Sequence, residues 1–248
     1  MIPKAFACFL LLTSIFGFEL HGEAFSPAGL FDLEAIRDEA SLETEVLVDW
    51  RPLPGNSSIR QKLVEITVCE WWPGQRVRIP VTFVVPSRGE PCENVLLINM
   101  GLGLKPGSPK GVPLELLIEK RIGLVMVGMG VIEAMKPVGQ LHDGMREQLL
   151  KTKKLRYTTA WIWGASQMRG LTAAIAEQGA FRPKKVLATG GSKRGIASAV
   201  AGIHDDRFTA IMPVVAPPLG NPGGEYVTGS RVSHIDLLNK LFFDDISS

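Results

Sequence analysis

Four short and nearly continuous apolar runs constrain the fold of this chain more than any other feature. They cover residues 94–100, 122–127, 185–189 and 208–215. Runs of this length and composition are typical of strands that are buried on both faces of a parallel sheet. Patterns of helical spacing lie between them, over residues 112–120, 155–178 and 196–204. This alternation predicts an α/β fold, a mostly parallel sheet with helices on both faces.

Two further strands are predicted upstream of these runs, at the N-terminal edge of the sheet. Apolar and polar residues alternate over residues 62–72 and again over 76–85, with a proline–glycine pair between them. Alternation of this kind around a short turn predicts an antiparallel hairpin. Residues 25–60 are mixed and polar, and we interpret them as an N-terminal arm, which leaves residues 61–248 as one α/β domain.

Residues 1–24 have the three-part pattern of a secretory signal peptide. A short start that carries Lys4 precedes an apolar run over residues 5–18, and Gly22 and Ala24 supply small residues before a cleavage site. We therefore expect an exported protein, secreted or periplasmic; the alternative is a buried N-terminal helix or strand. The apolar run is shorter than the roughly 20 residues that a transmembrane helix needs. No later segment has the pattern of a membrane span.

Composition and cysteine content narrow the partners and cofactors that this chain can use. Charged residues make up 21% of the chain and the formal net charge is +2, which argues against nucleic acid or an acidic surface as partner. Beyond the signal peptide, Cys69 and Cys92 either form a disulfide, as exported proteins can, or are two free thiols. No cysteine–histidine cluster has metal-site spacing, so neither a metal nor an organic cofactor is expected. The oligomeric state stays open.

The residues with the clearest chemical meaning form a tight turn between the third apolar run and the next helix. The turn covers residues 190–195 (GGSKRG), with Ser192 at its apex. A serine on a sharp strand-to-helix turn lies above the carboxyl ends of the strands, where it can act as a nucleophile. Gly190 lies where the crossing of strand and helix leaves no room for a Cβ atom, Gly191 follows it in the turn, and Gly195 lets the helix pack close to the strand. The N–H groups at the helix N-terminus suit the oxyanion of a tetrahedral intermediate.

Two other interpretations of this turn remain open. The usual elbow has the order G-x-S-x-G, whereas here Arg194 holds the place of the second glycine, which comes one residue later. Ser192 can instead be the N-cap of a structural turn. The turn can also bind an anion, although the order of a phosphate loop, GxxxxGK followed by Ser or Thr, is absent.

The same chemistry needs a second oxyanion donor and a general base. In hydrolases with this elbow, the loop after the first apolar run supplies the second donor; here its residues are Gly101, Leu102 and Gly103. The alternative for this loop is an ordinary strand-to-helix turn. His204 lies at the far end of the elbow helix, roughly 18 Å from Ser192 at 1.5 Å per residue. His234 is the one histidine beyond that helix and is therefore the candidate base.

The elbow and the residues after it resemble a known family. Residues 190–195 (GGSKRG) and 205–215 (DDRFTAIMPVV) are similar to the core G-x-S-K-R-G…D-R-x-x-A-I-x-P-V of the PhoPQ-activated pathogenicity-related family, which belongs to the α/β-hydrolase superfamily. Residues 157–170 resemble the helix before the elbow in this and neighbouring esterase families. The resemblance implies a serine hydrolase fold, and we expect a hydrolase of esterase type with a small-molecule or ester substrate. It also implies that Ser192 is the nucleophile and that Lys193 supplies an oxyanion-hole N–H.

The chain departs from the pattern of such hydrolases after the elbow. There the acid and the histidine follow the nucleophile, on loops after two further strands. About 31 residues follow Pro217, and they contain no pair of apolar runs. We therefore expect an exported hydrolase whose C-terminal strands are missing. The alternatives are a triad that uses His234 in an unusual place and a non-catalytic binding module on the same scaffold.

Overall fold

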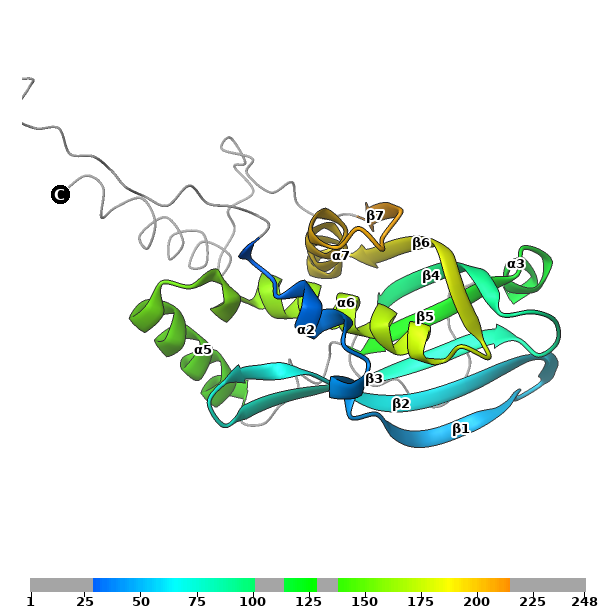
Figure 1. Cartoon of the computed structure of the whole chain (residues 1–248), viewed down its shortest axis with the longest axis horizontal. Coiled ribbons are helices and arrows are strands. Elements are labelled where there is room, and N and C mark those ends of the chain that lie inside the picture. Colours follow the sequence, from blue (N-terminus) through cyan, green and yellow to red (C-terminus); the bar gives the residue numbers. More distant parts are fainter. Residues whose placement is uncertain (1–28, 101–113, 129–137, 215–248) are drawn as a thin grey trace, which may run out of the picture.

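The computed structural model describes residues 29–100, 114–128 and 138–214 (Figure 1). The predicted signal peptide, the glycine loop at 101–103 and His234 lie outside the described residues. Within the described ranges, no helix combines the length and the apolar character that crossing a membrane requires.

Seven strands form one sheet in this part of the chain. They are β1 (Glu45–Leu53), β2 (Asn56–Trp72), β3 (Gln75–Pro86), β4 (Cys92–Met100), β5 (Ile122–Gly128), β6 (Phe181–Gly191) and β7 (Ala210–Val214). Their order across the sheet is β1-β2-β3-β5-β4-β6-β7. β1, β2, β3 and β5 pair antiparallel in succession, whereas β5, β4, β6 and β7 run parallel. The parallel half carries the candidate elbow.

These strands confirm the α/β architecture that the sequence predicts. The four apolar runs are β4, β5, β6 and β7, and the predicted hairpin is β2 and β3, which turn at Gly74 with a positive φ of 81°. The stretch interpreted as an arm contains the short helices α2 (Leu33–Arg37) and η2 (Ala40–Leu42) and the strand β1. β1 lies outside the hairpin, so the hairpin is one strand away from the N-terminal edge of the sheet.

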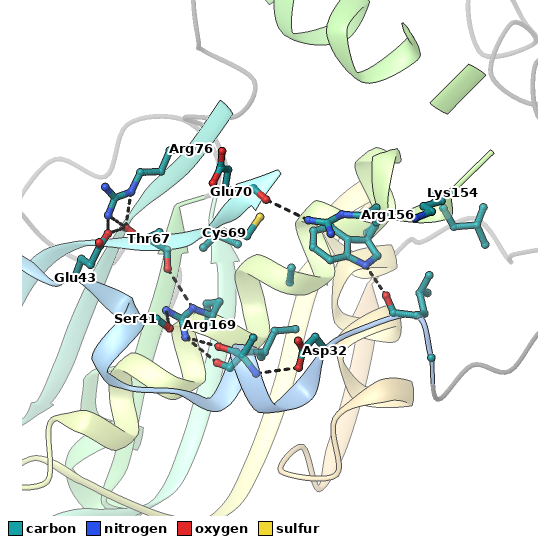
Figure 2. A pocket seen from close by; sticks show the side chains of 18 of the residues that line it. Asp32, Ser41, Glu43, Thr67, Cys69, Glu70, Arg76, Lys154, Arg156 and Arg169 are labelled. Atoms are coloured by element: carbon teal, nitrogen blue, oxygen red, sulfur yellow. Dashed lines mark hydrogen bonds and ion pairs between the residues drawn. The ribbon is translucent and has the colours of Figure 1, made fainter. Parts of the chain in front are cut away.

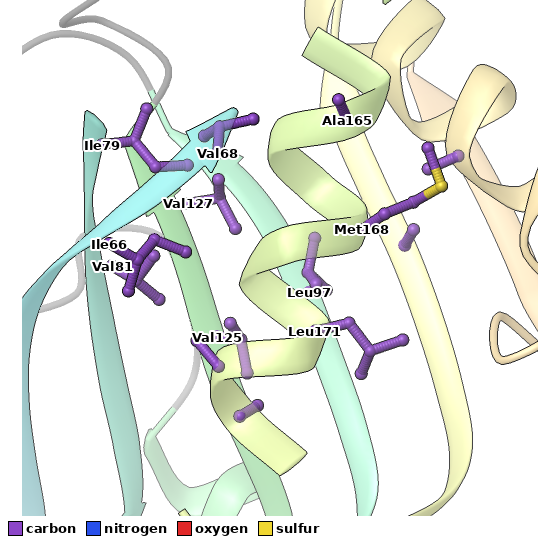
Figure 3. Close-up of a cluster of buried hydrophobic side chains, with 14 of the residues drawn as sticks. Ile66, Val68, Ile79, Val81, Leu97, Val125, Val127, Ala165, Met168 and Leu171 are labelled. Carbon is purple, nitrogen blue, oxygen red and sulfur yellow. The ribbon is translucent and has the colours of Figure 1, made fainter. Parts of the chain in front are cut away.

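Side chains of the central strands alternate between two cores, one on each face of the sheet. On β5, Val125 and Val127 join the larger core, whereas Leu124 and Met126 join the smaller one. α6 (Thr159–Ala176) and α7 (Lys193–His204) cover the larger core, and Figure 3 shows α6 packed on that face. α3 (Leu114–Glu119) contributes Leu117 to the smaller core. Helices therefore lie on both faces, as predicted.

α6 packs closely on the sheet because its sequence is rich in small residues and most of its length is buried. Its N-cap is Thr158, whose hydroxyl accepts a hydrogen bond from the N–H of Trp161 at 3.3 Å. A Cβ atom on Gly170 would lie 2.5 Å from the Val127 side chain, so the glycine permits this approach. The helix predicted from residue 155 begins at Thr159, because a 3₁₀ turn, η3 (Leu155–Tyr157), precedes it.

Two expectations about single elements are wrong. The sequence pattern predicts no helix between the strand at 122–127 and the helix at 155–178, but α5 (Val138–Thr152) lies there. The C-terminal residues of this helix, MREQLLKT, are mostly strong helix formers. A Cβ atom on Gly144 would lie 3.0 Å from the Trp72 ring, so the helix packs closely against that ring at the glycine. The second error is β7, predicted as a buried strand. All its residues are exposed, because in the described part of the chain only β6 pairs with it.

Cys69 and Cys92 are both free thiols, so the disulfide alternative is not formed. Burial raises the pKa of the Cys69 thiol to about 12. Because a thiolate is the reactive form, this cysteine stays protonated and inert near neutral pH. Burial also raises the pKa of Cys92.

Candidate active site

Ser192 has a backbone conformation that residues with a side chain rarely adopt. β6 ends at Gly191 and α7 begins at Lys193, so Ser192 alone joins the strand to the helix. Its φ is 54° and its ψ is −128°. Strained dihedral angles of this kind persist only where the surrounding structure fixes them, and they cluster at functional sites. The side chain of Ser192 is exposed.

Backbone hydrogen bonds on both sides hold this turn in place. The N–H of Ser192 donates to the carbonyl oxygen of Val214 on β7 at 2.8 Å. The carbonyl oxygen of Ser192 accepts from the N–H groups of Gly195, at 2.8 Å, and Ile196, at 3.4 Å. The Ser192 hydroxyl makes no capping bond to α7. The structure therefore disfavours the interpretation of Ser192 as an N-cap and leaves its hydroxyl on the surface.

The glycines of the turn differ in how strictly the structure requires them. A Cβ atom on Gly190 would lie 2.7 Å from the backbone oxygen of Arg194, so the close crossing inferred from the sequence is present. A Cβ atom on Gly191 would have no neighbour within 4 Å. Gly195 is buried in the first turn of α7. Of Gly190 and Gly191, Gly190 is thus the one that a direct steric contact with the elbow helix requires.

Lys193 begins the elbow helix, and its side chain is directed onto α6. The Nζ atom of Lys193 lies 5.6 Å from the centre of the Trp163 ring, which is cation–π distance. This contact joins the first turn of α7 to the N-terminal part of α6. The backbone of Lys193 is at the helix N-terminus, where the peptide dipoles favour negative charge.

The structure separates the described histidine of the elbow helix from Ser192. His204 is the last residue of α7, and its ring packs against Phe31 with 5.0 Å between ring centres. It therefore lies at the end of α7 opposite to Ser192, as the sequence predicts. The candidate base His234 and the loop donors Gly101, Leu102 and Gly103 lie outside the described residues.

The D-R motif after the elbow has a structural role. The Asp205 carboxylate is fully buried and accepts from Arg207, at 2.6 Å, and from Arg37 of α2, at 2.8 Å. Arg207 also donates to Thr172 at 3.0 Å and to the carbonyl oxygen of Met168 at 3.2 Å, both on α6. Burial alone would raise the pKa of Asp205, but the hydrogen bonds from the guanidinium groups lower it below its ordinary value. These contacts join α2, α6 and the end of α7.

A cavity of about 1310 Å³ lies beside α2, β2, η3 and α6, and no elbow residue lines it (Figure 2). Several of its charged groups are engaged with one another or with the backbone. Arg76 pairs with Glu43, and Arg156 donates to the carbonyl oxygen of Glu70 at 3.1 Å. Arg169 is almost fully buried and donates to the backbone carbonyls of Thr67, Ala35, Ile36 and Asp38. We therefore place the candidate chemistry at the elbow and not in this cavity.

Arg169 is a residue whose role sequence reasoning missed. It stands at the end of a stretch that resembles a family helix, but nothing in the spacing indicates that a fully buried guanidinium anchors the N-terminal segment to α6.

In the described ranges, no group of three or more His, Cys, Asp or Glu side chains is placed to hold a metal ion.

Comparison with known proteins supports the family resemblance over the elbow region. The family model of the PhoPQ-activated pathogenicity-related protein matches residues 154–221, which include α6, β6, the elbow and β7. This confirms the resemblance that the sequence motifs indicate. No curated protein matches the chain.

Several solved esterase structures resemble this chain at low identity. A glucuronoyl esterase from Solibacter usitatus is 18% identical, with a TM-score of 0.49, over 68% of this chain and 50% of its own. An acetyl xylan esterase from Paenibacillus sp. R4 is 14% identical, with a TM-score of 0.44, over 73% of this chain and 57% of its own. The chain thus spans about half the length of these structures. Likeness at this level does not transfer an activity.

Proposed function

We propose that this chain is an exported serine hydrolase of esterase type in which Ser192 is the nucleophile. The observation that carries the proposal is the exposed serine with φ 54° and ψ −128° between β6 and α7. A strained strand-to-helix turn of this kind presents the nucleophile in hydrolases with an elbow. The family match over residues 154–221 and the close approach of Gly190 to Arg194 support it.

The proposed reaction transfers an acyl group to Ser192 and then to water. The Oγ atom of Ser192 attacks the ester carbonyl carbon while a histidine takes its proton; His234 is the candidate within this chain. The carbonyl oxygen becomes an oxyanion, held by the N–H of Lys193 and by N–H groups of the loop at 101–103. Collapse of the intermediate expels the alcohol, which receives the proton from the histidine. Water then attacks the acyl-enzyme by the same route and releases the acid.

Labelling with a fluorophosphonate tests this proposal, because the probe phosphonylates activated serines. The purified chain, Ser192→Ala and the exposed-serine control Ser57→Ala are compared. We expect labelling of the wild type and of Ser57→Ala, and none of Ser192→Ala. A folded wild-type chain that takes up no label would contradict an active hydrolase in these 248 residues.

A second candidate function is a non-catalytic binding module on the same scaffold. It is favoured by the position of His204, which packs on Phe31 at the end of α7 remote from Ser192. A serine without a base can contribute to a binding pocket but not to acyl transfer. This alternative predicts that esters stabilise the chain against heat without being hydrolysed, and that Ser192→Ala retains the stabilisation.

A further inference from the structure

A buried amide and a buried hydroxyl connect α6 to the first turn of the elbow helix. Gln167 on α6 and Ser198 on α7 both have no exposed surface. The Nε2 atom of Gln167 donates to the Oγ atom of Ser198 at 2.9 Å. The Ser198 hydroxyl donates in turn to the carbonyl oxygen of Arg194 at 3.2 Å. Arg194 is two residues after Ser192, so the chain of hydrogen bonds ends at the elbow.

The donor and acceptor roles in this chain follow from the single proton of the Ser198 hydroxyl. That proton goes to Arg194, so the hydroxyl oxygen can only accept from the neighbouring amide. Gln167 must therefore present its NH₂ group to Ser198. A helical serine that donates to the carbonyl four residues earlier is common. Here an amide from a second helix additionally fixes the direction of the hydroxyl.

The Arg194 carbonyl is also the tightest point of the elbow. It lies 2.7 Å from the position of a Cβ atom on Gly190, at the end of β6. Gly190 and Arg194 flank Ser192 on its two sides in the sequence. A displacement of the Arg194 carbonyl therefore changes the crossing of β6 and α7, and with it the orientation of Ser192.

Gln167 does not fit an apolar core as well as a hydrocarbon side chain would. Its Oε1 atom is buried and has no hydrogen-bond partner in the described part of the chain. A buried acceptor without a partner destabilises the folded state. Gln167 makes one side-chain hydrogen bond here, to Ser198, and that bond leads to the elbow.

We propose that Gln167 is a positioning residue for Ser192, acting through Ser198 and the Arg194 carbonyl. The inference rests on the proposed role of Ser192 as nucleophile. Gln167 does not contact the substrate in this proposal. It holds the first turn of α7 so that the strained serine keeps the orientation needed for attack.

Phosphonylation kinetics of the full chain test the positioning role, with the maximal rate kinact separated from the apparent affinity KI. In Gln167→Leu and Ser198→Ala we expect kinact to fall at least tenfold. Small displacements of a reacting group lower the rate of reaction about 10- to 100-fold. KI and the final labelled fraction stay as in the wild type. The double variant is no slower than either single variant, because both remove one chain of bonds.

Ser166→Ala is the matched control. Ser166 is the neighbour of Gln167 and has no exposed surface, and its hydroxyl donates to the carbonyl oxygen of Ile162 within α6 at 2.7 Å. A loss of folding lowers the labelled fraction, whereas a loss of positioning lowers kinact at full labelling. Unchanged kinact in Gln167→Leu and Ser198→Ala would overturn the proposal.

Amide hydrogen exchange separates this proposal from the proposed function. The N–H groups of Gly195 and Ile196 bond to the Ser192 carbonyl, so their exchange reports the geometry of the turn whether or not the serine reacts. We expect at least fivefold faster exchange there in Gln167→Leu and no change in Ser166→Ala. A wild type that takes up no label would contradict the proposed function. Equal protection of these amides in Gln167→Leu and Ser166→Ala would overturn the positioning role.

Discussion

At the residue scale, the chain maintains a strained backbone at Ser192. Dihedral angles in a sparsely populated region cost about 1–3 kcal/mol per residue. The structure offsets this cost with hydrogen bonds from Ser192 to Val214 and from Gly195 and Ile196 to Ser192. The missing side chain at Gly190 is equally important, because it lets β6 and α7 approach each other. The exposed hydroxyl is the part of this turn that is free for chemistry.

We predict that Gly190→Ala disrupts the elbow while Gly191→Ala does not. The new methyl group at Gly190 lies 2.7 Å from the Arg194 backbone oxygen, and backbone atoms cannot move aside without moving Ser192. Overpacking of this kind costs about 1–3 kcal/mol. At Gly191 nothing lies within 4 Å, so the change in stability stays within about 1 kcal/mol. Urea unfolding measures both, and equal stabilities would show that the crossing tolerates a side chain.

At the element scale, the sequence predicted the strands and the elbow more fully than the connections between helices. The apolar runs of β4, β5 and β6 follow directly from burial on both faces, so their pattern is visible in the sequence. α5 was missed because two glycines interrupt its N-terminal half. The contacts of Arg169 with Ile36 and of Asp205 with Arg37 join residues more than 100 positions apart, which no local pattern encodes. The same limit applies to the contact between Gln167 and Ser198.

The packing of α2 and α6 against the end of α7 depends on the charge of Asp205. Its pKa lies below the ordinary value of 3.8, so it contributes stability above that pH and loses it as the pH falls through the lower folded-state value. We predict that Asp205→Asn costs about 3–5 kcal/mol near neutral pH, because Arg207 is left without its buried partner. The stability of this variant also depends less on pH in the acid range.

Asp206→Asn is the control for that substitution. Asp206 also pairs with Arg37, but its side chain is 85% exposed. An exposed pair contributes about 0–1 kcal/mol. Urea unfolding across the acid range distinguishes the two carboxylates. Parallel curves for wild type and Asp205→Asn would mean that the buried ion pair does not contribute to the acid dependence.

At the scale of the whole molecule, the described part of the sheet has a covered interior and an exposed edge strand, β7. β2 to β6 are covered by helices or by neighbouring strands, and the alternation on β5 divides the core between the two faces. β7 is different, because Ile211, Met212 and Val214 are 39%, 50% and 43% exposed. The sequence predicted this strand from its apolar residues but not its exposure, since burial depends on what lies beside it in space. An apolar edge strand is a template for pairing with another chain.

We predict that the 248-residue chain self-associates through β7 and that Met212→Lys reduces this association. A charged side chain on an edge strand opposes strand pairing between molecules, whereas Met212 offers an apolar one. Leu150→Lys is the matched control, because it introduces the same charge at a side chain that is 41% exposed on α5, away from the sheet edge. Sedimentation velocity at increasing protein concentration measures the outcome. Equal relief by both variants would mean that net charge controls association, and no relief by Met212→Lys would mean that β7 is not the contact.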